Sequence, residues 1–492
     1  MAQKRNVLLV YPGNIKSITK RMPLSILYLA ESLIKEGYDP VLLDMQVDSF
    51  SQDMLRDAVC AGISTLTGEQ IKYGIAVADL IRRANPAIPI VWGGIHPSIM
   101  PEQTARHPLV DYVMYGEGEE AFPLLVKALD ARGDCSAVPN LVFRQGSAVK
   151  STPRIPFINF NRDNKLPYDL LPLSRYQTST RFEYQSSRGC PHGCLFCYNE
   201  GFNQFKWRSK DSAIVLDELE QIKKRFNPQY LFFVDDEFFI HRKRAQDIME
   251  GMLKRGLDFK WKAAIRIDTI NASSREFLDL LDKSGCMEMP MGAESGSDRI
   301  LALVKKKITR KDILASAGHT KGMRLVPQYS FMGGFPGETV DELNETVTCM
   351  DELWGINPEV KINGLFFATP FPGTQLFELA VANGYTPPLS LDEWGNIDFI
   401  MSYKNVPYVS REFTQKLVVF AFLVRFRYLW MHSASFLKNK KNMATFKYWG
   451  FVAFRILFSP FNVMFKVRWT NRFTAFPIDI FAARFVLSRI AA

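Results

Sequence analysis

Short apolar runs alternate with helical patterns over residues 4–150. The apolar runs at residues 6–11, 40–44, 61–64, 88–92 and 112–115 predict strands. Amphipathic stretches such as residues 24–37 lie between them and predict helices. Strands that are apolar throughout and alternate with helices are typical of a parallel sheet covered on both faces. The pattern therefore predicts a doubly wound α/β domain over residues 1–135.

Residues 136–181 read as a linker. A small hairpin is predicted around Gly146, and Pro153, Pro156, Pro167 and Pro172 then break any long element. The hydrophobic pattern resumes at residue 182.

A second βα series spans residues 182–400. Strands are predicted at residues 230–235, 261–266, 287–292, 326–332 and 361–367. Together with a strand before residue 188, they make six or seven units, which are too few for an eight-fold barrel. We therefore expect a partial (β/α)6 barrel, with reactive residues at the rim formed by the carboxyl ends of its strands.

The last region, residues 401–492, is basic and aromatic. The chain carries a net charge of +10, and from residue 411 onward 14 Lys and Arg face only Glu412 and Asp479. Its two apolar runs, residues 418–430 and 446–458, are shorter than the roughly eighteen residues of a spanning helix. Short amphipathic helices at an anionic membrane surface fit the pattern, and a helical cap packed on the barrel fits it equally. No recognisable nucleic-acid-binding module accompanies the charge, so we do not expect nucleic acid as a partner.

The strongest chemical signal is a run of three cysteines. Cys190, Cys194 and Cys197 stand at C-x3-C-x2-C spacing on a loop rich in Gly and Pro. Thiolates bind soft iron, and three of them leave one iron of a four-iron cube with an open position. A zinc knuckle would need a fourth ligand, and His192 lies between the cysteines, where it could hardly complete a tetrahedron. A disulfide would leave one cysteine over and needs an oxidising compartment.

The other four cysteines carry no pairing rhythm. Cys60, Cys135, Cys286 and Cys349 are scattered, and we interpret them as buried small hydrophobes. An odd cysteine count and no recognisable signal peptide predict a reducing cytoplasm.

With the aromatic Phe196 before the last cysteine, this run resembles the motif of the radical S-adenosylmethionine (SAM) family. In that family a [4Fe-4S] cluster held by the three cysteines chelates SAM at its open iron and, when reduced, cleaves it to a 5′-deoxyadenosyl radical. Motifs at later strand ends resemble the family in order along the chain. The resemblance implies that SAM is bound by the following residues, in addition to Phe196: Asp235, Asp236, Arg266, Glu294, Ser295, Gly333 and Gly334.

Three of these motifs also have a structural interpretation. Acids are favoured at helix N-termini, which is an alternative explanation of the run that contains Asp235 and Asp236. Arg266, expected at the end of the third strand, could form a structural ion pair. The motif at Glu294 could be a capping box with Asp298.

Glycine-rich loops follow the strands of the first domain. W-G-G-x-H-P-S at residues 92–98 and Y-G-E-G-E at residues 115–119 resemble the cobalamin-binding domain that precedes the barrel in one large radical SAM subfamily. No G-x-G-x-x-G follows the first strand, which argues against NAD and FAD. The resemblance implies a Rossmann-like domain that binds cobalamin through the following residues: Ser64, Thr65, Thr67, Gly93, Gly94, His96, Gly116, Glu117 and Gly118.

The axial histidine found in many cobalamin domains is missing. Those domains donate it from a D-x-H-x-x-G loop after the first strand, whereas the first histidine of this chain is His96. Resemblance to the subgroup without this histidine implies base-off cobalamin with no protein ligand to cobalt. His96 is then either a cobalt contact or a hydrogen bonder that stabilises its loop.

Together the motifs imply an anaerobic cobalamin-dependent radical SAM enzyme. We expect methylation of an unactivated carbon in an apolar, lipid- or tetrapyrrole-like substrate; the alternative is an oxidative cyclase that transfers no methyl group. An electron donor such as flavodoxin or ferredoxin would be a partner, and residues 405–492 could contact the inner face of the membrane. A tRNA methylthiolating enzyme would need a second three-cysteine cluster, which Cys60 and Cys135 cannot supply. A cobalamin sensor without enzymatic activity would have no use for the cysteine run.

Overall fold

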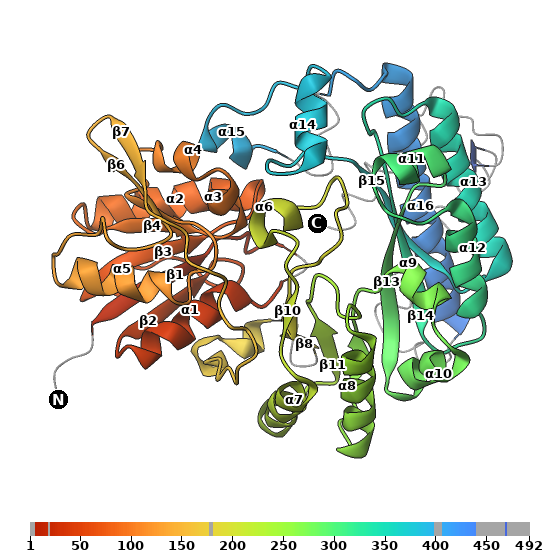
Figure 1. Ribbon diagram of the computed structural model, residues 1–492, viewed down its shortest axis with the longest axis horizontal. Coiled ribbons are helices and arrows are strands. Elements are labelled where there is room, and N and C mark those ends of the chain that lie inside the picture. The colour runs from red at the N-terminus through yellow and green to blue at the C-terminus, as the bar shows by residue number, and fades with distance from the viewer. Residues whose placement is uncertain (1–4, 18–19, 177–180, 398–405, 439–467, 470–492) are drawn as a thin grey trace.

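The computed structural model describes residues 5–17, 20–176, 181–397, 406–438 and 468–469, with side chains of the last helix described as far as residue 427. Within them, two sheets with their covering helices lie next to each other, and the loop before α6 (Asn199–Asn203) lies between them (Figure 1). The predicted fold class, a doubly wound domain followed by a partial barrel and a C-terminal helix, is confirmed.

The first sheet has the strand order β2-β1-β3-β4-β5-β6-β7. Its first five strands are parallel, and the hairpin predicted in the linker adds β6 and β7 antiparallel to β5. The order reverses beside β1, and ligands bind at the carboxyl ends of the strands at such a point. The strands are β1 (Asn6–Tyr11), β2 (Asp39–Asp44), β3 (Ala58–Ser64), β4 (Ile90–Gly93), β5 (Tyr112–Met114), β6 (Leu141–Gln145) and β7 (Ala148–Ser151).

Helices bury both faces of this sheet. Alternate residues of β1 point to opposite faces, so Leu8 and Val10 join one core cluster and Val7 and Leu9 the other. This explains why the strand is apolar at successive positions. The helices are α1 (Leu24–Lys35), α2 (Glu69–Ala84), α3 (Ile95–Ile99), α4 (Pro101–Ala105) and α5 (Ala121–Asp130), with a 3-10 turn at Gln52–Leu55.

The second sheet is an open barrel of six parallel strands in the order β8-β11-β12-β13-β14-β15. The strands are β8 (Arg181–Tyr184), β11 (Tyr230–Phe233), β12 (Lys260–Lys262), β13 (Cys286–Glu294), β14 (Val326–Gly333) and β15 (Lys361–Phe367). A short antiparallel ribbon pairs β9 (Ser187–Arg188) with β10 (Arg208–Ser209).

Helices cover the outside of the barrel sheet. They are α7 (Ser212–Phe226), α8 (Arg242–Lys254), α9 (Ile267–Asn271), α10 (Arg275–Lys283), α11 (Asp298–Leu303), α12 (Arg310–His319) and α13 (Val340–Ile356), with 3-10 turns at Tyr168–Leu170 and Leu173–Arg175 in the linker. In contrast, α14 (Gln375–Ala382) packs beside the cysteine loop, where the Leu376 amide donates to the Leu195 carbonyl at 2.8 Å.

Two expected strand ends in the barrel are wrong. The strand expected over residues 230–235 ends at Phe233. The prediction ended the third barrel strand at Arg266, whereas β12 ends at Lys262 and Arg266 is the N-cap residue of α9. The chain leaves the ladder after Lys262 but still follows β13, since the Ile265 amide donates to the Pro290 carbonyl at 3.1 Å. Arg266 therefore remains at the rim of the barrel.

The predicted short amphipathic helices are wrong for the first apolar run of the last region. Residues 418–430 belong to one helix of 28 residues, α16 (Arg411–Lys438). It packs on β15 and α13, and it buries Leu417, Phe420 and Val424. In the described residues this run is therefore a cap on the barrel. The second run, residues 446–458, lies outside the described residues. No described helix is both long and apolar enough to cross a membrane.

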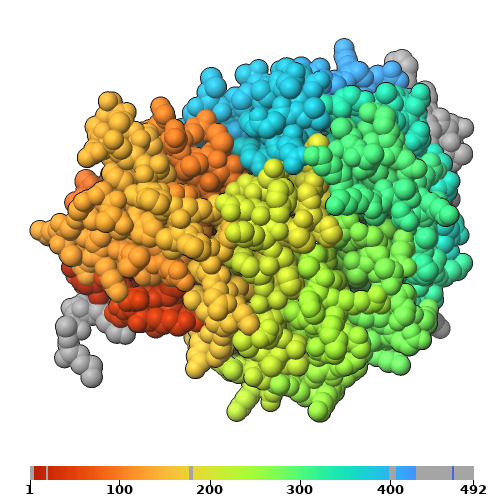
Figure 2. Space-filling view, viewed as in Figure 1, coloured from red at the N-terminus to blue at the C-terminus, as the bar shows by residue number. Residues whose placement is uncertain are grey.

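The chain returns from the barrel to the first domain after α14. On α15 (Leu391–Gly395), Trp394 is fully buried and its Nε1 donates to Gln103 Oε1 at 2.7 Å. Figure 2 shows residues near 380–395, in blue, reaching the orange surface of the first domain, while the yellow residues fill the seam below. In that seam Tyr176 donates to Asp44 at 2.5 Å. Polar contacts from the linker and from α15 thus fix one domain against the other.

Candidate functional site

The three cysteines lie on the loop between β9 and α6. All are partly exposed, and none of the seven cysteines, which all lie in the described residues, forms a disulfide. The Cys197 amide donates to the Cys194 carbonyl at 3.0 Å, and Asn199 Nδ2 donates to Cys197 Sγ at 3.4 Å. Gly189 begins the loop at φ +81°, where a Cβ would lie 2.1 Å from the Lys206 carbonyl oxygen. Only glycine fits there.

The donor set of this loop fits an iron–sulfur cluster better than a mononuclear metal. Three free thiols on one short loop match the ligands of a cube with one open corner. Among the described residues, no three His, Cys, Asp or Glu side chains are grouped to hold a single metal ion. Burial raises the pKa of the Cys190 thiol to about 12, so the loop without iron favours neutral thiols at that position.

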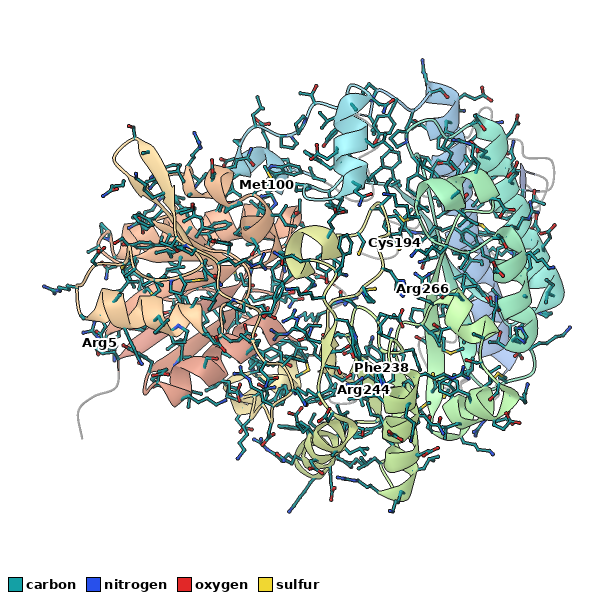
Figure 3. All side chains as sticks on the ribbon, viewed as in Figure 1. Arg5, Met100, Cys194, Phe238, Arg244 and Arg266 are labelled. Carbon is teal, nitrogen blue, oxygen red and sulfur yellow. The ribbon has the colours of Figure 1, made fainter. Side chains whose placement is uncertain are left out.

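Two basic side chains, Arg266 and Lys306, lie near the cysteine loop. Arg266 and Lys306 both lie within electrostatic range of Cys194, and Figure 3 shows Arg266 beside Cys194. Arg266 binds Asp268 through two nitrogens at 2.9 and 3.0 Å and donates to the Lys306 carbonyl at 2.8 Å. The ion pair expected as its structural interpretation therefore exists. Both cations at this rim are thus already paired, Arg266 with Asp268 and Lys306 with Glu294.

Glu294 lies in the same group with an unusual backbone. Its φ is +63°, and its Oε1 accepts from Lys306 Nζ at 2.8 Å. A Cβ on Gly292 would lie 2.0 Å from that carboxylate oxygen and 2.7 Å from Lys306 Nζ, so a larger residue there would displace the pair. Ser295 points elsewhere: it is fully buried and its hydroxyl bonds Thr346 of α13 at 3.0 Å. The structure thus brings Glu294, but not the Ser295 hydroxyl, to the cysteine loop.

The two consecutive aspartates after β11 have different surroundings. Asp235 is buried and accepts from both the amide and the hydroxyl of Ser186 and from Ser187, at 2.5–2.7 Å. Asp236 accepts from the Gly189 amide at 2.8 Å and from the Tyr198 hydroxyl. Asp235 therefore braces the strand ends, while Asp236 holds the cysteine loop at both its start and its end.

Gly333 is the last residue of β14 and Gly334 follows it, and both are closely covered. Gly334 has φ +90°, and a Cβ there would lie 2.4 Å from the ring of Phe367. Its amide donates to Glu338 Oε2 at 2.6 Å. Thr339, not Glu338, caps α13, in a capping box with Glu342. The Phe196 ring lies 6.5 Å from that of Phe335 and joins the loop of Cys197 to this segment.

A cavity of about 400 Å³ lies where the two domains meet. On one side it is lined by the loops after β3, β4 and β5, and on the other by β8, the residue after β11 and the flanks of the cysteine loop. The predicted cobalamin residues that line it are Ser64, Thr65, Gly93, Gly94, Gly116, Glu117 and Gly118. From the barrel side Arg188, Tyr198 and Asp236 line it as well.

The cavity wall fits a large amide-bearing ring such as corrin. Thr65 is buried, and its hydroxyl has no hydrogen-bond partner among the described residues. A Cβ on Gly94, which has φ +98°, would lie 2.6 Å from the Thr65 carbonyl oxygen. Glycine therefore allows the two loops to touch and leaves backbone and hydroxyl groups for a ligand. A polar atom left unsatisfied at a wall of this kind is a hydrogen-bonding position for a guest.

His96 and Thr67 do not line the cavity. His96 is fully buried, its Nδ1 shares a hydrogen bond of 3.0 Å with the Thr67 hydroxyl, and its ring lies 5.5 Å from that of Trp394. Burial lowers its pKa to about 3, which keeps the ring neutral. Of its two interpretations, the structure shows the loop-stabilising one.

Glu117 lines the cavity but is also a junction between the domains. Its carboxylate accepts from Arg188 at 3.0 Å, from Arg208 at 2.6 Å and from the Ile158 amide at 2.9 Å. Arg188 also pairs with Glu119 at 2.7 Å. The segment that leads into the cysteine loop is thereby tied directly to the glycine loop after β5.

Sequence reasoning did not select several residues of this site. Arg188 and Tyr198 flank the cysteine motif, and Glu119 lies within the Y-G-E-G-E motif, so their positions were a signal. No sequence signal pointed to Lys306, because its ion pair with Glu294 depends on how the chain turns back after α11, and residue spacing does not predict that turn. Glu237 is buried next to Asp236, and burial raises its pKa to about 7.

A glycine-lined doubly wound domain that faces a partial barrel with three free thiols defines a two-cofactor class of enzyme. Family models agree with this: the B12 binding domain model matches residues 16–126, and the radical SAM superfamily model matches residues 184–350. An uncharacterised methyltransferase of Pyrococcus horikoshii is 31% identical over 414 residues, which cover 81% of this chain and 88% of that protein. The chain belongs to the B12-binding radical SAM family, and its cofactors are a [4Fe-4S] cluster, SAM and cobalamin.

Two further relatives bear on fold and chemistry. The anaerobic magnesium-protoporphyrin IX monomethyl ester cyclase of Rubrivivax gelatinosus is 26% identical over 425 residues, 80% of this chain and 75% of that protein. The solved structure of the cobalamin-dependent SAM radical enzyme OxsB, with aqua-cobalamin and SAM bound, superposes with a TM-score of 0.69 at 18% identity. It covers 95% of this chain and 72% of that chain, and it shows the shared fold.

Proposed function

We propose that this radical SAM enzyme methylates an unactivated carbon of an apolar, lipid- or tetrapyrrole-like substrate. The observation that carries the proposal is the cavity lined both by the glycine loops of the first domain and by the flanks of the cysteine loop. An sp3 carbon offers no nucleophile, so a radical route and a methyl carrier must reach the same atom. The similarity to the Pyrococcus methyltransferase over most of both chains supports methyl transfer.

When bound, the cluster supplies the electron that cleaves SAM, and cobalamin supplies the methyl group. The chain's own residues position these groups. Cys190, Cys194 and Cys197 would hold the iron, and Arg266 would bind the carboxylate of SAM at the rim of the barrel. Ser64, Thr65 and the backbone at Gly93 and Gly94 would hold the corrin, without a protein ligand to cobalt.

The test uses anaerobically reconstituted protein and SAM with a labelled methyl group. We expect 5′-deoxyadenosine from the wild type and none from a Cys194→Ala variant, because that variant lacks one of three cluster ligands. Cleavage of SAM by the variant at the wild-type rate would contradict the cluster assignment. Labelled methyl on extracted lipid or pigment from the native host would identify the substrate.

An oxidative cyclase is the second candidate function. The relative from Rubrivivax gelatinosus supports it, since the similarity spans three quarters or more of each chain. The same labelling experiment separates the two functions: a cyclase forms 5′-deoxyadenosine and leaves no labelled methyl on its product.

Two partners follow from this function. The cluster needs an electron donor such as flavodoxin or ferredoxin, and an apolar substrate would be met at the inner face of the membrane through residues 405–492. Liposome flotation of the full chain on anionic and neutral vesicles tests the second partner. Recovery with anionic vesicles only is expected, and no flotation on either vesicle would remove the membrane from the proposal.

A further inference from the structure

The inward face of the barrel sheet carries charge, whereas its outward face is apolar. Successive residues of a strand point to opposite faces. Phe182 and Tyr184 of β8 and Trp261 of β12 are buried in the core shared with the covering helices. The residues between them, Arg181, Glu183 and Lys262, therefore face the lumen of the barrel.

One row of this lumen is continuous across four strands. Glu183 of β8 lies opposite Phe232 of β11, Phe232 lies opposite Lys262 of β12, and Lys262 lies opposite Glu288 of β13. Lys262 Nζ is 3.7 Å from Glu288 Oε2, and these side chains are 27% and 38% exposed. The row is thus open to a ligand at Lys262 and Glu288, whereas Glu183 is buried.

Two cations of the lumen share a single neutral ring. Arg181 Cζ lies 4.1 Å and Lys262 Nζ 4.0 Å from the centroid of Phe232. The two charged groups are therefore within about 8 Å of each other, a range at which like charges in a protein repel appreciably. Cation–π contacts of about 1 kcal/mol each hold them in place without neutralising them.

Positive charge exceeds negative charge at this place. Arg21 lines the cavity next to Glu183, whose Oε2 accepts from the Met22 amide at 3.2 Å. Burial raises the pKa of Glu183, which weakens it as a counter-ion. The pKa of Lys262 is lowered, first by burial and then by Arg181, Arg21 and Lys361, against the opposing effect of Glu288. An anion from outside the chain would relieve this excess.

The inward face also offers a neutral donor. Gln328 of β14 lies opposite Lys361 of β15 and is 3% exposed. Its Nε2 has no hydrogen-bond partner among the described residues. A buried amide nitrogen without a partner costs free energy unless a ligand accepts from it.

We propose that this lumen binds a carboxylate arm of the substrate, with Arg181 and Lys262 as its ligands. The inference rests on the proposed function and narrows its substrate class to amphiphilic molecules with an acidic arm. The cavity reaches Glu183 and Val234, and Val234 follows Phe232 by two positions on the same face of the chain. Two residues of a strand span about 7 Å. An apolar body on the barrel side of the cavity, facing the glycine loops that would hold the corrin, would thus place an arm of a few bonds beside the two cations.

The test compares the acid and ester forms of one molecule. Mesoporphyrin IX and its dimethyl ester are bound to the reconstituted full chain in detergent, and affinities are measured by equilibrium dialysis. Oleate and methyl oleate repeat the comparison with a lipid body. The variants are Arg181→Met and Lys262→Met, which keep the apolar stem of each side chain, and Lys254→Met, an exposed lysine of α8, is the matched control.

We expect the wild type to bind at least one acid about tenfold more tightly than its ester, the effect of a single charge-assisted hydrogen bond. Arg181→Met and Lys262→Met should each remove most of this preference and leave ester binding unchanged, and Lys254→Met should keep it. Equal affinity for acid and ester with both bodies, a preference that survives both lumen variants, or no binding of either body would overturn the inference. Formation of 5′-deoxyadenosine by the wild type is measured in parallel, so that failure of the proposed function is distinguished from failure of the anion site.

Discussion

Arg188 joins the segment before the cysteine loop to the glycine loop after β5. Replacing it tests whether cobalamin binding at the glycine loop depends on this contact. Its guanidinium pairs with Glu117 at 3.0 Å and with Glu119 at 2.7 Å, and it lies 4.5 Å from the ring centroids of both Tyr28 and Phe160. The side chains of all three charged residues are no more than 13% exposed. Burial disfavours the charge of Arg188, but Glu119 and Glu117 more than offset this and raise its pKa. The cation therefore links the segment before the cysteine loop to the glycine loop after β5.

The Arg188→Met variant keeps the apolar stem and removes the charge. The buried Glu119 carboxylate then loses its ion pair with Arg188, while Glu117 keeps its ion pair with Arg208 at 2.6 Å. Removing one partner of a buried ion pair costs about 3–5 kcal/mol. Arg255→Met is the control, because Arg255 also pairs with two carboxylates, at 2.6 and 3.0 Å, but at an exposed position. Pairs of that kind contribute about 1 kcal/mol or less.

The assay is urea denaturation of the full chain, followed by tryptophan fluorescence, with cobalamin affinity as a second readout. We expect a loss of about 3–5 kcal/mol for Arg188→Met, and partial recovery of about 1–3 kcal/mol when Glu119→Gln is added, because the unpaired carboxylate is then gone. Cobalamin affinity should fall although Arg188 precedes the cysteine loop. Strict additivity of the two substitutions, or a loss no larger than that of Arg255→Met, would refute this account.

Two other substitutions test local parts of the site. Burial raises the pKa of Glu338 to about 7, so its carboxyl group holds a proton more tightly in the folded state than in the unfolded chain. This protonation stabilises the folded state at low pH, and the stabilisation is lost as the pH rises from about 4.5 to about 7. Glu338→Gln should flatten this dependence by about 1–3 kcal/mol when unfolding free energies are compared at pH 5 and pH 8, and identical slopes for the two proteins would contradict it. Gly94→Ala places a Cβ 2.6 Å from the Thr65 carbonyl oxygen, at a backbone φ of +98°. We expect this variant to bind cobalamin at least tenfold more weakly when affinity is measured by equilibrium dialysis. Gly318→Ala on α12 is the control, because its Cβ would have nothing within 4 Å, and it should bind cobalamin as the wild type does. Equal cobalamin affinity of the two alanine variants would count against the glycine loops as the corrin site.

Local pattern was enough for the architecture and for the order of motifs. Five apolar runs gave β1 to β5 because each strand is buried on both faces, as the two core clusters on either side of β1 show. Glycines after β4 and β5 marked the cavity wall because bare backbone is needed where loops approach each other closely. Cys190, Cys194 and Cys197 lie on one loop, so their spacing in the sequence was enough to predict the cluster site.

Contacts between distant segments escaped the sequence. Arg188 and Glu117 are 71 positions apart, and no periodicity links them. His96 was included among the cobalamin residues because it lies in the W-G-G-x-H-P-S motif. Its ring is instead buried next to Trp394, nearly 300 positions further along the chain. The charged row of the lumen was hidden for another reason: Glu183, Lys262 and Glu288 stand in strands whose other face is apolar, and alternation alone does not tell a lumen from solvent.

The central claim is that one chain cleaves SAM beside a cobalamin held by the glycine loops. Its most direct test is a single anaerobic incubation of reconstituted protein with cobalamin, a chemical reductant and SAM labelled at the methyl group. The account predicts both 5′-deoxyadenosine and a labelled methyl group on the bound cobalamin, and predicts that Cys194→Ala loses the first product. A fully loaded wild-type protein that forms neither product would contradict the account.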